Sequence, residues 1–277
     1  MDITSPKTIK ELLKNHETRA SKGLGQNFLI DRNVLEKIIK SAELNPDDTV
    51  LEIGPGIGTL TQELAESAGK VIAIEKDKKM VAILAETLKD CGNVEIINAD
   101  ALKFKADIKK YKVVANIPYY ITSPLIRKFL ETENQPEFLV LMVQKEVAQR
   151  ICSRPPDMSL LSVSVQFYAE PKIVSMVLKN CFWPAPKVDS AILKITPKNV
   201  GLPLSPELFF KIVKAGFTQP RKQLVNNLTT LKSLNGVKLD KYKTTEWLLK
   251  NNLKPNQRAE TLKIDDWINL TKSLNKI

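Results

Sequence analysis

Short apolar runs alternate with longer amphipathic stretches between residues 49 and 144, and this alternation limits the possible folds more than any other feature. Five runs rich in Val, Ile and Leu are typical of strands: TVLEIG (49–54), KVIAIEKD (70–77), VEIINAD (94–100), KVVANIP (112–118) and FLVLMVQ (138–144). The stretches TLTQELAESAG and KKMVAILAETLKD, between the first three runs, carry apolar residues at helical spacing. Strands linked through helices run parallel and are buried on both faces, so the sequence predicts a doubly wound α/β sheet.

The pattern changes after residue 144, where strand-like runs follow one another without helices between them. Short linkers join the runs SVSVQFYA (162–169), KIVSMVL (172–178) and SAILKITP (190–197). A linker of a few residues can reverse the chain, but it cannot carry the chain back to start a parallel strand. We therefore expect an antiparallel end to an otherwise parallel sheet.

A linker with one Gly and two Pro, KNVGLPLSP (198–206), precedes a last third in which the apolar spacing is helical. The sequence thus predicts two domains, an α/β domain over residues 1–197 and a small all-helical domain over residues 198–277. The second holds fifteen Lys and Arg residues against six Asp and Glu, which is +9 of the total net charge of +11. A solvated helical surface is one interpretation of this excess, and a polyanionic partner is the other.

The composition disfavours several classes of function. The single histidine, His16, and the widely spaced Cys91, Cys152 and Cys181 predict no Ser-His-Asp or Cys-His set, no disulfide framework and no metal site. The N-terminal segment lacks the apolar core of a signal peptide, and the longest strongly apolar run, FLVLMV, is too short to span a bilayer. We therefore expect a cytoplasmic protein without a metal ion or a membrane partner.

Three successive predicted strands end in residues suited to binding a nucleoside. Gly54 opens a glycine loop after the first strand, where the missing Cβ lets the backbone pass close to a ligand. Glu75 ends the second strand, at a spacing suited to a carboxylate that binds both ribose hydroxyls. Asp100 ends the third strand and can accept a hydrogen bond from an adenine amino group. Taken singly, each acid could equally be a solvated strand end.

The glycine loop separates two classes of nucleoside cofactor. The dinucleotide pattern G-x-G-x-x-G would place its third glycine at position 59, where this chain has Thr59. The pocket therefore lacks an obvious clamp for a pyrophosphate. S-adenosylmethionine (SAM) fits this arrangement better than NAD.

The segment NIPYYITSPL (116–125) follows the fourth predicted strand directly. Pro118 cannot donate to a sheet ladder, so the strand must end near it. Asn116 and Tyr119 are then presented at a strand end, where ligands of open α/β sheets usually bind. A turn with two partly buried rings is the alternative interpretation of this segment.

Eight segments in order carry a resemblance to a known family over nearly the whole chain. They are GQNFLID (25–31), LEIGPGIGTLT, IEKD, NADAL, NIPYYITSPL, MVQKEVAQRI, FWPAPKVDSA and GFTQPRKQLVNNL. The tetrapeptide NIPY resembles the [DNS]-[IP]-P-[YFW] motif of enzymes that methylate exocyclic amines. The whole set is similar to the KsgA (RsmA) family of ribosomal RNA adenine dimethyltransferases, which are class I SAM-dependent methyltransferases.

The resemblance implies a Rossmann-like domain with a C-terminal helical domain, acting as a monomer on immature small ribosomal subunits. The implied reaction transfers two methyl groups to N6 of each of two adjacent adenosines near the 3′ end of 16S rRNA. It implies SAM contacts by Asn27, Leu29, Gly54, Glu75, Asp100 and Asn116. It also implies that Tyr119 and Phe182 hold the target base, and phosphate contacts by Arg221 and Lys222 are plausible in the basic domain.

This resemblance suggests what NIPY does. An adenine amino group is a poor nucleophile because it is conjugated into the ring, and it is barely acidic, so a strong base would help little. The Asn116 amide oxygen and the Pro118 carbonyl can instead accept both N6 hydrogens and orient the nitrogen lone pair. Tyr119 would supply a stacking face for a base that has left its own stack.

Two positions depart from the family pattern. Trp183 stands where many members have a small residue or Thr, which leaves the share of base stacking open between Phe182 and Trp183. Pro220 replaces an expected Arg, so one phosphate contact is missing or displaced.

Three alternatives remain at this point. An erythromycin-resistance methylase would act on large-subunit rRNA, although GQNFLID and FWPAPKVDS favour the small-subunit enzymes. A non-catalytic assembly or transcription factor could keep the same fold, although the intact Glu75, Asp100 and NIPY argue against lost catalysis. A dehydrogenase is disfavoured by Thr59 and by the lack of hydride-site residues.

Overall fold

The computed structural model describes residues 2–21, 23–198 and 204–274. It divides into two compact units. The first contains residues 1–148 and 169–197, and the second contains residues 149–168 and 198–277. Residues 149–168, which we expected in the first domain, therefore pack with the second.

The first unit is built around a seven-stranded sheet with the order β4-β3-β2-β5-β6-β9-β7. Its strands are β2 (Thr49–Ile53), β3 (Lys70–Glu75), β4 (Val94–Asn98), β5 (Lys112–Asn116), β6 (Leu139–Gln144), β7 (Ala169–Val177) and β9 (Ser190–Pro197). Strands β2 to β6 pair in parallel, whereas β9 is antiparallel to both β6 and β7. This confirms the predicted mostly parallel sheet with an antiparallel end. The chain order reverses between β2 and β5, and the carboxyl ends of such strands are where open sheets bind ligands.

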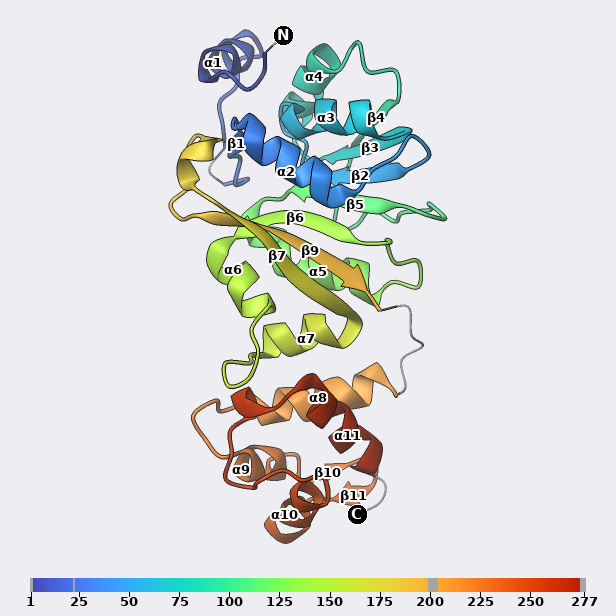
Figure 1. Ribbon diagram of the computed structural model, residues 1–277, viewed down its shortest axis with the longest axis vertical. Coiled ribbons are helices and arrows are strands. Elements are labelled where there is room, and N and C mark those ends of the chain that lie inside the picture. Colours follow the sequence, from blue (N-terminus) through green and yellow to red (C-terminus); the bar gives the residue numbers. More distant parts are fainter. Residues whose placement is uncertain (1, 22, 199–203, 275–277) are drawn as a thin grey trace. The chain divides into compact units, whose positions relative to one another are not determined.

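Helices accompany the sheet in the chain, and two of them begin at side-chain caps. They are α1 (Pro6–Asn15), α2 (Arg32–Ala42), α3 (Thr59–Ser67), α4 (Lys78–Thr87), α5 (Thr122–Glu131) and α6 (Lys145–Ile151), with a 3₁₀ turn η1 (Tyr119–Ile121). The Asp31 and Asp77 side chains cap α2 and α4 by accepting backbone N–H bonds. Figure 1 shows α2 and α3 lying in front of the sheet, and Ile38 and Leu64 share an apolar cluster with Val50 of β2.

One predicted strand is wrong. Residues 162–169 lie mostly in the helix α7 (Leu160–Tyr168) and not in a strand. Ser159 begins this helix, because its hydroxyl accepts the Ser162 N–H at 3.2 Å and the Ser162 hydroxyl accepts the Ser159 N–H at 2.7 Å. The Phe167 ring then stacks on Phe209 at a centroid distance of 4.0 Å. A local cap and a distant aromatic contact therefore favour a helix over the strand that the alternating pattern predicts.

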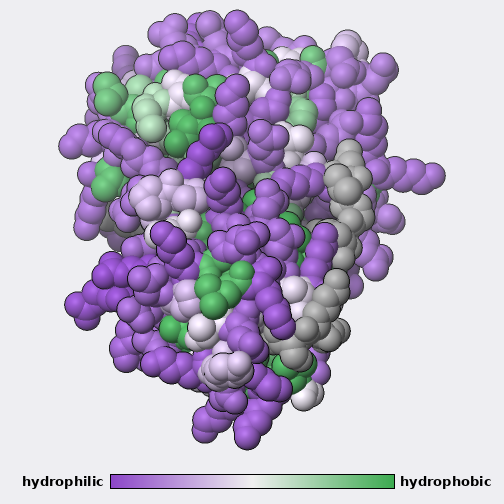
Figure 2. All heavy atoms as spheres, turned by 60° about the horizontal axis from the view of Figure 1, so that its bottom comes forward, coloured by the Kyte–Doolittle hydropathy of each residue, from purple (hydrophilic) through white to green (hydrophobic). Residues whose placement is uncertain are grey.

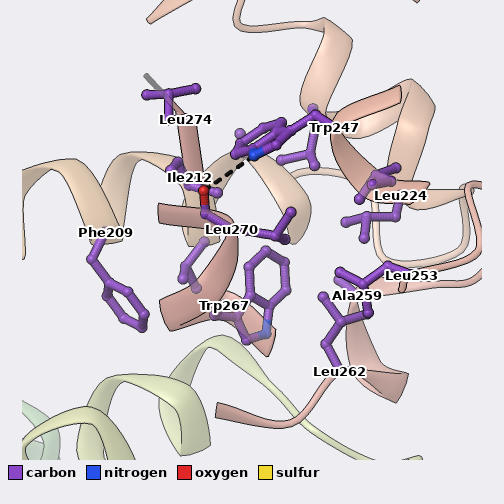
Figure 3. Packing of buried hydrophobic residues seen from close by; sticks show 14 of the residues in the cluster. Phe209, Ile212, Leu224, Trp247, Leu253, Ala259, Leu262, Trp267, Leu270 and Leu274 are labelled. Carbon is purple, nitrogen blue, oxygen red and sulfur yellow. Dashed lines mark hydrogen bonds between the residues drawn. The ribbon is translucent and has the colours of Figure 1, made fainter. Parts of the chain in front are cut away.

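The second unit is mainly helical, as expected. Besides α7 it contains α8 (Pro206–Gly216), α9 (Leu224–Thr229), α10 (Lys241–Lys250) and α11 (Ile264–Ser273). Its core surrounds Trp247 and Trp267, both fully buried, and the Trp247 Nε1 donates to the Leu270 carbonyl at 3.1 Å (Figure 3). No helix in the described part of the chain is long and apolar enough to cross a membrane.

The helical pattern predicted for RKQLVNNLTTLKSL continues only to the end of α9. The chain then forms a small hairpin of β10 (Ser233–Leu234) and β11 (Val237–Lys238). Asn235 and Gly236 between them have φ angles of +47° and +78°, as a two-residue type I′ turn requires. The Asn-Gly pair is the sequence signal that the helical interpretation missed.

Candidate active site

One cavity of the first unit opens at the carboxyl ends of the parallel strands. Segments 24–29, 52–60, 74–76, 99–102 and 116–121 contribute to its lining. All six residues expected to contact SAM line it, and so do Pro118 and Tyr119. The six are Asn27, Leu29, Gly54, Glu75, Asp100 and Asn116. The sequence thus named residues from five separate segments that the fold brings together.

The glycine loop after β2 is held in a conformation that side chains would obstruct. Gly54 and Gly56 have φ angles of +69° and +61°, in the left-handed region. A Cβ on Gly54 would lie 3.3 Å from Pro118 Cδ, and one on Gly56 would lie 3.1 Å from Phe28 Cε1. The loop therefore packs directly against NIPY on one side and the N-terminal segment on the other.

Glu75, at the end of β3, is fixed by two backbone donors. Its Oε1 accepts the Asp77 N–H at 2.8 Å, and its Oε2 accepts the Gly56 N–H at 3.2 Å. Burial nevertheless raises the pKa of the Glu75 carboxyl, against the opposing effect of these hydrogen bonds. A carboxylate has about four acceptor positions, so two remain for a ligand with paired hydroxyls. This fits the ribose of SAM.

Asp100 follows β4 and is charged. Its Oδ2 pairs with the Lys76 ammonium at 3.0 Å, and its Oδ1 accepts the Leu102 N–H at 3.0 Å. The hydrogen bond from Lys76 lowers the pKa of the Asp100 carboxyl. Lys128 of α5 donates to the carbonyls of Ala101 and Phe104, which anchors this wall of the cavity.

Asn116, the last residue of β5, is oriented by the N-terminal segment. Its Nδ2 donates to the Asn27 carbonyl at 3.0 Å, and the Asn27 side chain donates to the Gly25 carbonyl at 3.1 Å. Gln26 fastens the same segment to the start of α4, because its Nε2 donates to Asp77 Oδ2 at 3.1 Å. With its nitrogen engaged, the Asn116 amide can present its oxygen as an acceptor.

Pro118 and Tyr119 complete the strand-end motif. The Pro118 carbonyl accepts the Ile121 N–H at 3.1 Å, which leaves its second lone pair for a ligand. Tyr119 is half-buried, and its hydroxyl shares a 2.7 Å hydrogen bond with the buried Ser190 of β9. Burial raises the pKa of the Tyr119 phenol, so the ring is neutral and fixed at one edge.

Glu52 is a cavity residue that the sequence analysis did not single out. It is 1% exposed within β2, and its Oε2 is buried without a hydrogen-bond partner. Burial raises its pKa to about 8. The signal was an acid inside the otherwise apolar run TVLEIG, two residues before Gly54. Lys76 and Tyr120 also line the cavity and were not anticipated.

Phe182 does not lie in the cavity lining, contrary to the role expected from the resemblance. It is 2% exposed and belongs to an apolar cluster with Leu29 and Val34. The short strands β1 (Phe28–Leu29) and β8 (Phe182–Trp183) pair here, so that Leu29 lies opposite Phe182. The Trp183 ring stacks on Phe28, with the two ring centroids 6.5 Å apart. Phe182 is therefore packed in the apolar core of the first unit and not exposed at the cavity.

Arg221 and Lys222 lie in the second unit, in the turn just before α9, and both are exposed. Most of the surface in Figure 2 is hydrophilic, and apolar side chains form only small separate patches. Such exposed basic side chains are available to a phosphate backbone.

A model of the family described as ribosomal RNA adenine dimethylase matches residues 17–276. The chain belongs to this family. It is 45% identical over 265 residues to ribosomal RNA small subunit methyltransferase A of Dehalococcoides mccartyi, covering 93% of this chain and 89% of that protein. It is 40% identical to the protein of the same name from Bacillus cereus, over 99% of this chain and 97% of that one.

Two solved structures resemble the rRNA adenine dimethylase fold of this chain, each at 30% identity over 90% of it. A dimethyladenosine transferase from Plasmodium falciparum gives a TM-score of 0.79 over 98% of its own length. The 23S rRNA methyltransferase ErmE gives 0.73 over all of its length. The rRNA adenine dimethylase described here is therefore a class I methyltransferase that uses SAM to dimethylate adenine in rRNA, as the resemblance implied.

Proposed function

We propose that this enzyme dimethylates N6 of two adjacent adenosines near the 3′ end of 16S rRNA. Its substrate would be the rRNA within an immature small ribosomal subunit, where methylation accompanies maturation, and the enzyme would act as a cytoplasmic monomer. The name shared by the relatives at 40% to 45% identity, ribosomal RNA small subunit methyltransferase A, supports the small subunit over the large one.

SAM, when bound, supplies a methyl group activated by its sulfonium. The residues that would hold it are Asn27, Leu29, Gly54, Glu75, Asp100 and Asn116. Glu75 would accept from the ribose hydroxyls, because two backbone donors already fix its orientation. Asp100 would accept from the adenine amino group, and Gly54 would let the backbone approach the ligand closely.

The orientation of Asn116 carries the proposal. Its amide nitrogen is held by the Asn27 carbonyl, so its oxygen can accept one N6 hydrogen of the target adenine. The free lone pair of the Pro118 carbonyl can accept the other, and Tyr119 can lie against the base. Two acceptors held in fixed positions favour a pyramidal nitrogen with its lone pair available, which is catalysis by positioning. No side chain has to remove a proton before attack.

The basic region 198–277 would bind rRNA, with Arg221 and Lys222 contacting phosphates. Their exposure in the turn before α9 and the net charge of +9 in this region support this role. Phosphate contacts fix position and register and carry no sequence information themselves. Selectivity for the adenosines would then depend on the cavity and its rim.

Mass spectrometry of rRNA after incubation with the purified enzyme, SAM and unmethylated ribosomal subunits tests the proposal. We expect two dimethyladenosines in 16S rRNA near its 3′ end and none in 23S rRNA. Dimethylation of 23S rRNA alone would instead assign the enzyme to the erythromycin-resistance type. Absence of any methyl transfer, with tight subunit binding retained, would favour a non-catalytic assembly factor.

A further inference from the structure

Tyr120 presents an exposed aromatic ring at the cavity that Asn116 lines. It is 57% exposed and lines the same cavity. Tyr119, directly before it, is half-buried and fixed through Ser190. Of the large exposed hydrophobic residues in the described part of the first unit, Tyr120 is the one aromatic. At this exposure it is not a core residue, and its hydroxyl makes no hydrogen bond to the described residues, so neither role explains a tyrosine here.

Tyr119 and Tyr120 point in different directions, so they cannot both stack on the same face of one base. They lie in the 3₁₀ turn η1, which has about three residues per turn, so successive side chains point about 120° apart. Tyr119 points toward β9, where Ser190 holds its hydroxyl. Tyr120 lies instead close to the N-terminal segment, since a Cβ on Gly25 would be 3.8 Å from its Cδ1.

The surroundings of Tyr120 suit a nucleotide. Lys76 lines the same cavity, and although its ammonium pairs with Asp100 at 3.0 Å, its side chain is 59% exposed; Leu102 is 37% exposed there. A positive charge beside an aromatic ring is the usual combination for holding single-stranded nucleic acid. An adenine that enters the cavity must leave its stack, so a neighbouring base loses a stacking partner. An exposed ring at the rim can replace that partner.

We propose that Tyr120 binds the nucleobase adjacent to the target adenosine by stacking. The ligand class is an unstacked base of single-stranded RNA, and the inference rests on the proposed function for the identity of the target. Through this contact Tyr120 compensates the unstacking that base entry requires. It is a substrate-positioning residue outside the set that holds the methyl donor.

Steady-state kinetics with unmethylated small subunits test this role in three variants. Tyr120→Ala and Tyr120→Leu should raise the KM for the subunit by about 5- to 150-fold, the change that corresponds to about 1–3 kcal/mol for one stacked base. Tyr120→Phe should stay within about threefold of wild type, because the π-face is retained. Leu178→Ala, at a 60% exposed residue outside the cavity, is the control and should change nothing.

Two further measurements separate the alternatives. The Kd for SAM, from calorimetry without RNA, should be equal in all variants; a weakened Kd with an unchanged subunit KM would overturn the inference and make Tyr120 a cover for the cofactor. An RNA hairpin with 2-aminopurine next to the target adenosine should show fluorescence quenching with wild type and Tyr120→Phe, and not with Tyr120→Leu. Equal quenching by the Leu variant also overturns it. If wild type quenches but transfers no methyl group, the proposed function fails while the base contact stands.

Discussion

Replacing Glu75 by Gln or Ala tests whether this carboxylate binds the methyl donor. Both Glu75 oxygens accept backbone N–H groups, from Asp77 and Gly56, so the side chain is fixed before a ligand arrives. Glutamine keeps the size but loses the charge, and its NH₂ group faces one of the two N–H donors. Alanine removes every acceptor.

The expected losses follow from hydrogen-bond strengths. Two charge-assisted bonds to ribose hydroxyls are worth about 1.5–3 kcal/mol each, so Glu75→Ala should cost about 3–6 kcal/mol of SAM affinity. A neutral acceptor is worth about 0.5–1.5 kcal/mol, so Glu75→Gln should cost about 2–3 kcal/mol, which raises the Kd roughly 30- to 150-fold.

Isothermal titration of SAM into RNA-free protein measures both losses, with thermal unfolding to confirm that each variant folds. Glu95→Gln is the matched control, because Glu95 is a half-exposed acid on the neighbouring strand β4 that pairs with Lys70. Affinity should fall in the order wild type and Glu95→Gln, then Glu75→Gln, then Glu75→Ala. A Kd for Glu75→Ala within threefold of wild type would refute the assignment.

Three further predictions address the base, the buried acid and the basic region. Asn116→Ala should abolish methyl transfer in a folded protein, and near-normal turnover on small subunits would contradict the positioning mechanism. Glu52 ionises near pH 4.5 when unfolded but at about 8 when folded, so its contribution to stability is complete below pH 4.5 and is lost as the pH rises through 8. The free energy of unfolding of Glu52→Gln should therefore rise relative to that of wild type between pH 5 and pH 8, by up to about 1.4 kcal/mol per pH unit. Thermal unfolding at several pH values measures this, and a difference between the two proteins that stays constant with pH would argue against a buried neutral acid. Reversing Arg221 and Lys222 to Glu should weaken subunit binding and flatten its salt dependence without changing the Kd for SAM, whereas the exposed pair Lys89→Glu and Lys109→Glu in the first unit should change neither.

Charge reversal is a cleaner test of the basic region than truncation at residue 197. Helix α7 belongs to the same unit, and its Phe167 stacks on Phe209 of α8. Deleting residues 198–277 would therefore expose the apolar face of α7. If such a deletion abolished subunit binding, misfolding and the loss of phosphate contacts would be equally good explanations.

The sequence by itself determined the parallel sheet and most of the site. Apolar runs at regular intervals can be buried only as strands between helices, and parallel strands place their carboxyl ends at one edge. Gly54, Glu75, Asp100 and Asn116 each end or follow such a run, so their convergence followed from the strand pattern alone. The observed cavity contains all four.

Only the tertiary structure decided which side chains were buried, exposed or charged. Phe182 opens the segment FWPAPKVDSA and Tyr120 directly follows NIPY, so both are aromatic residues of a family motif. Phe182 is 2% exposed, whereas Tyr120 is 57% exposed. Glu52 has its pKa raised because neighbouring strands and α3 remove it from water, which no local pattern reports. Helix α7 likewise owes its conformation to the Ser159 cap and to a partner more than forty residues away along the chain. Periodicity specifies the apolar face of a segment, whereas burial depends on which distant segment packs against that face.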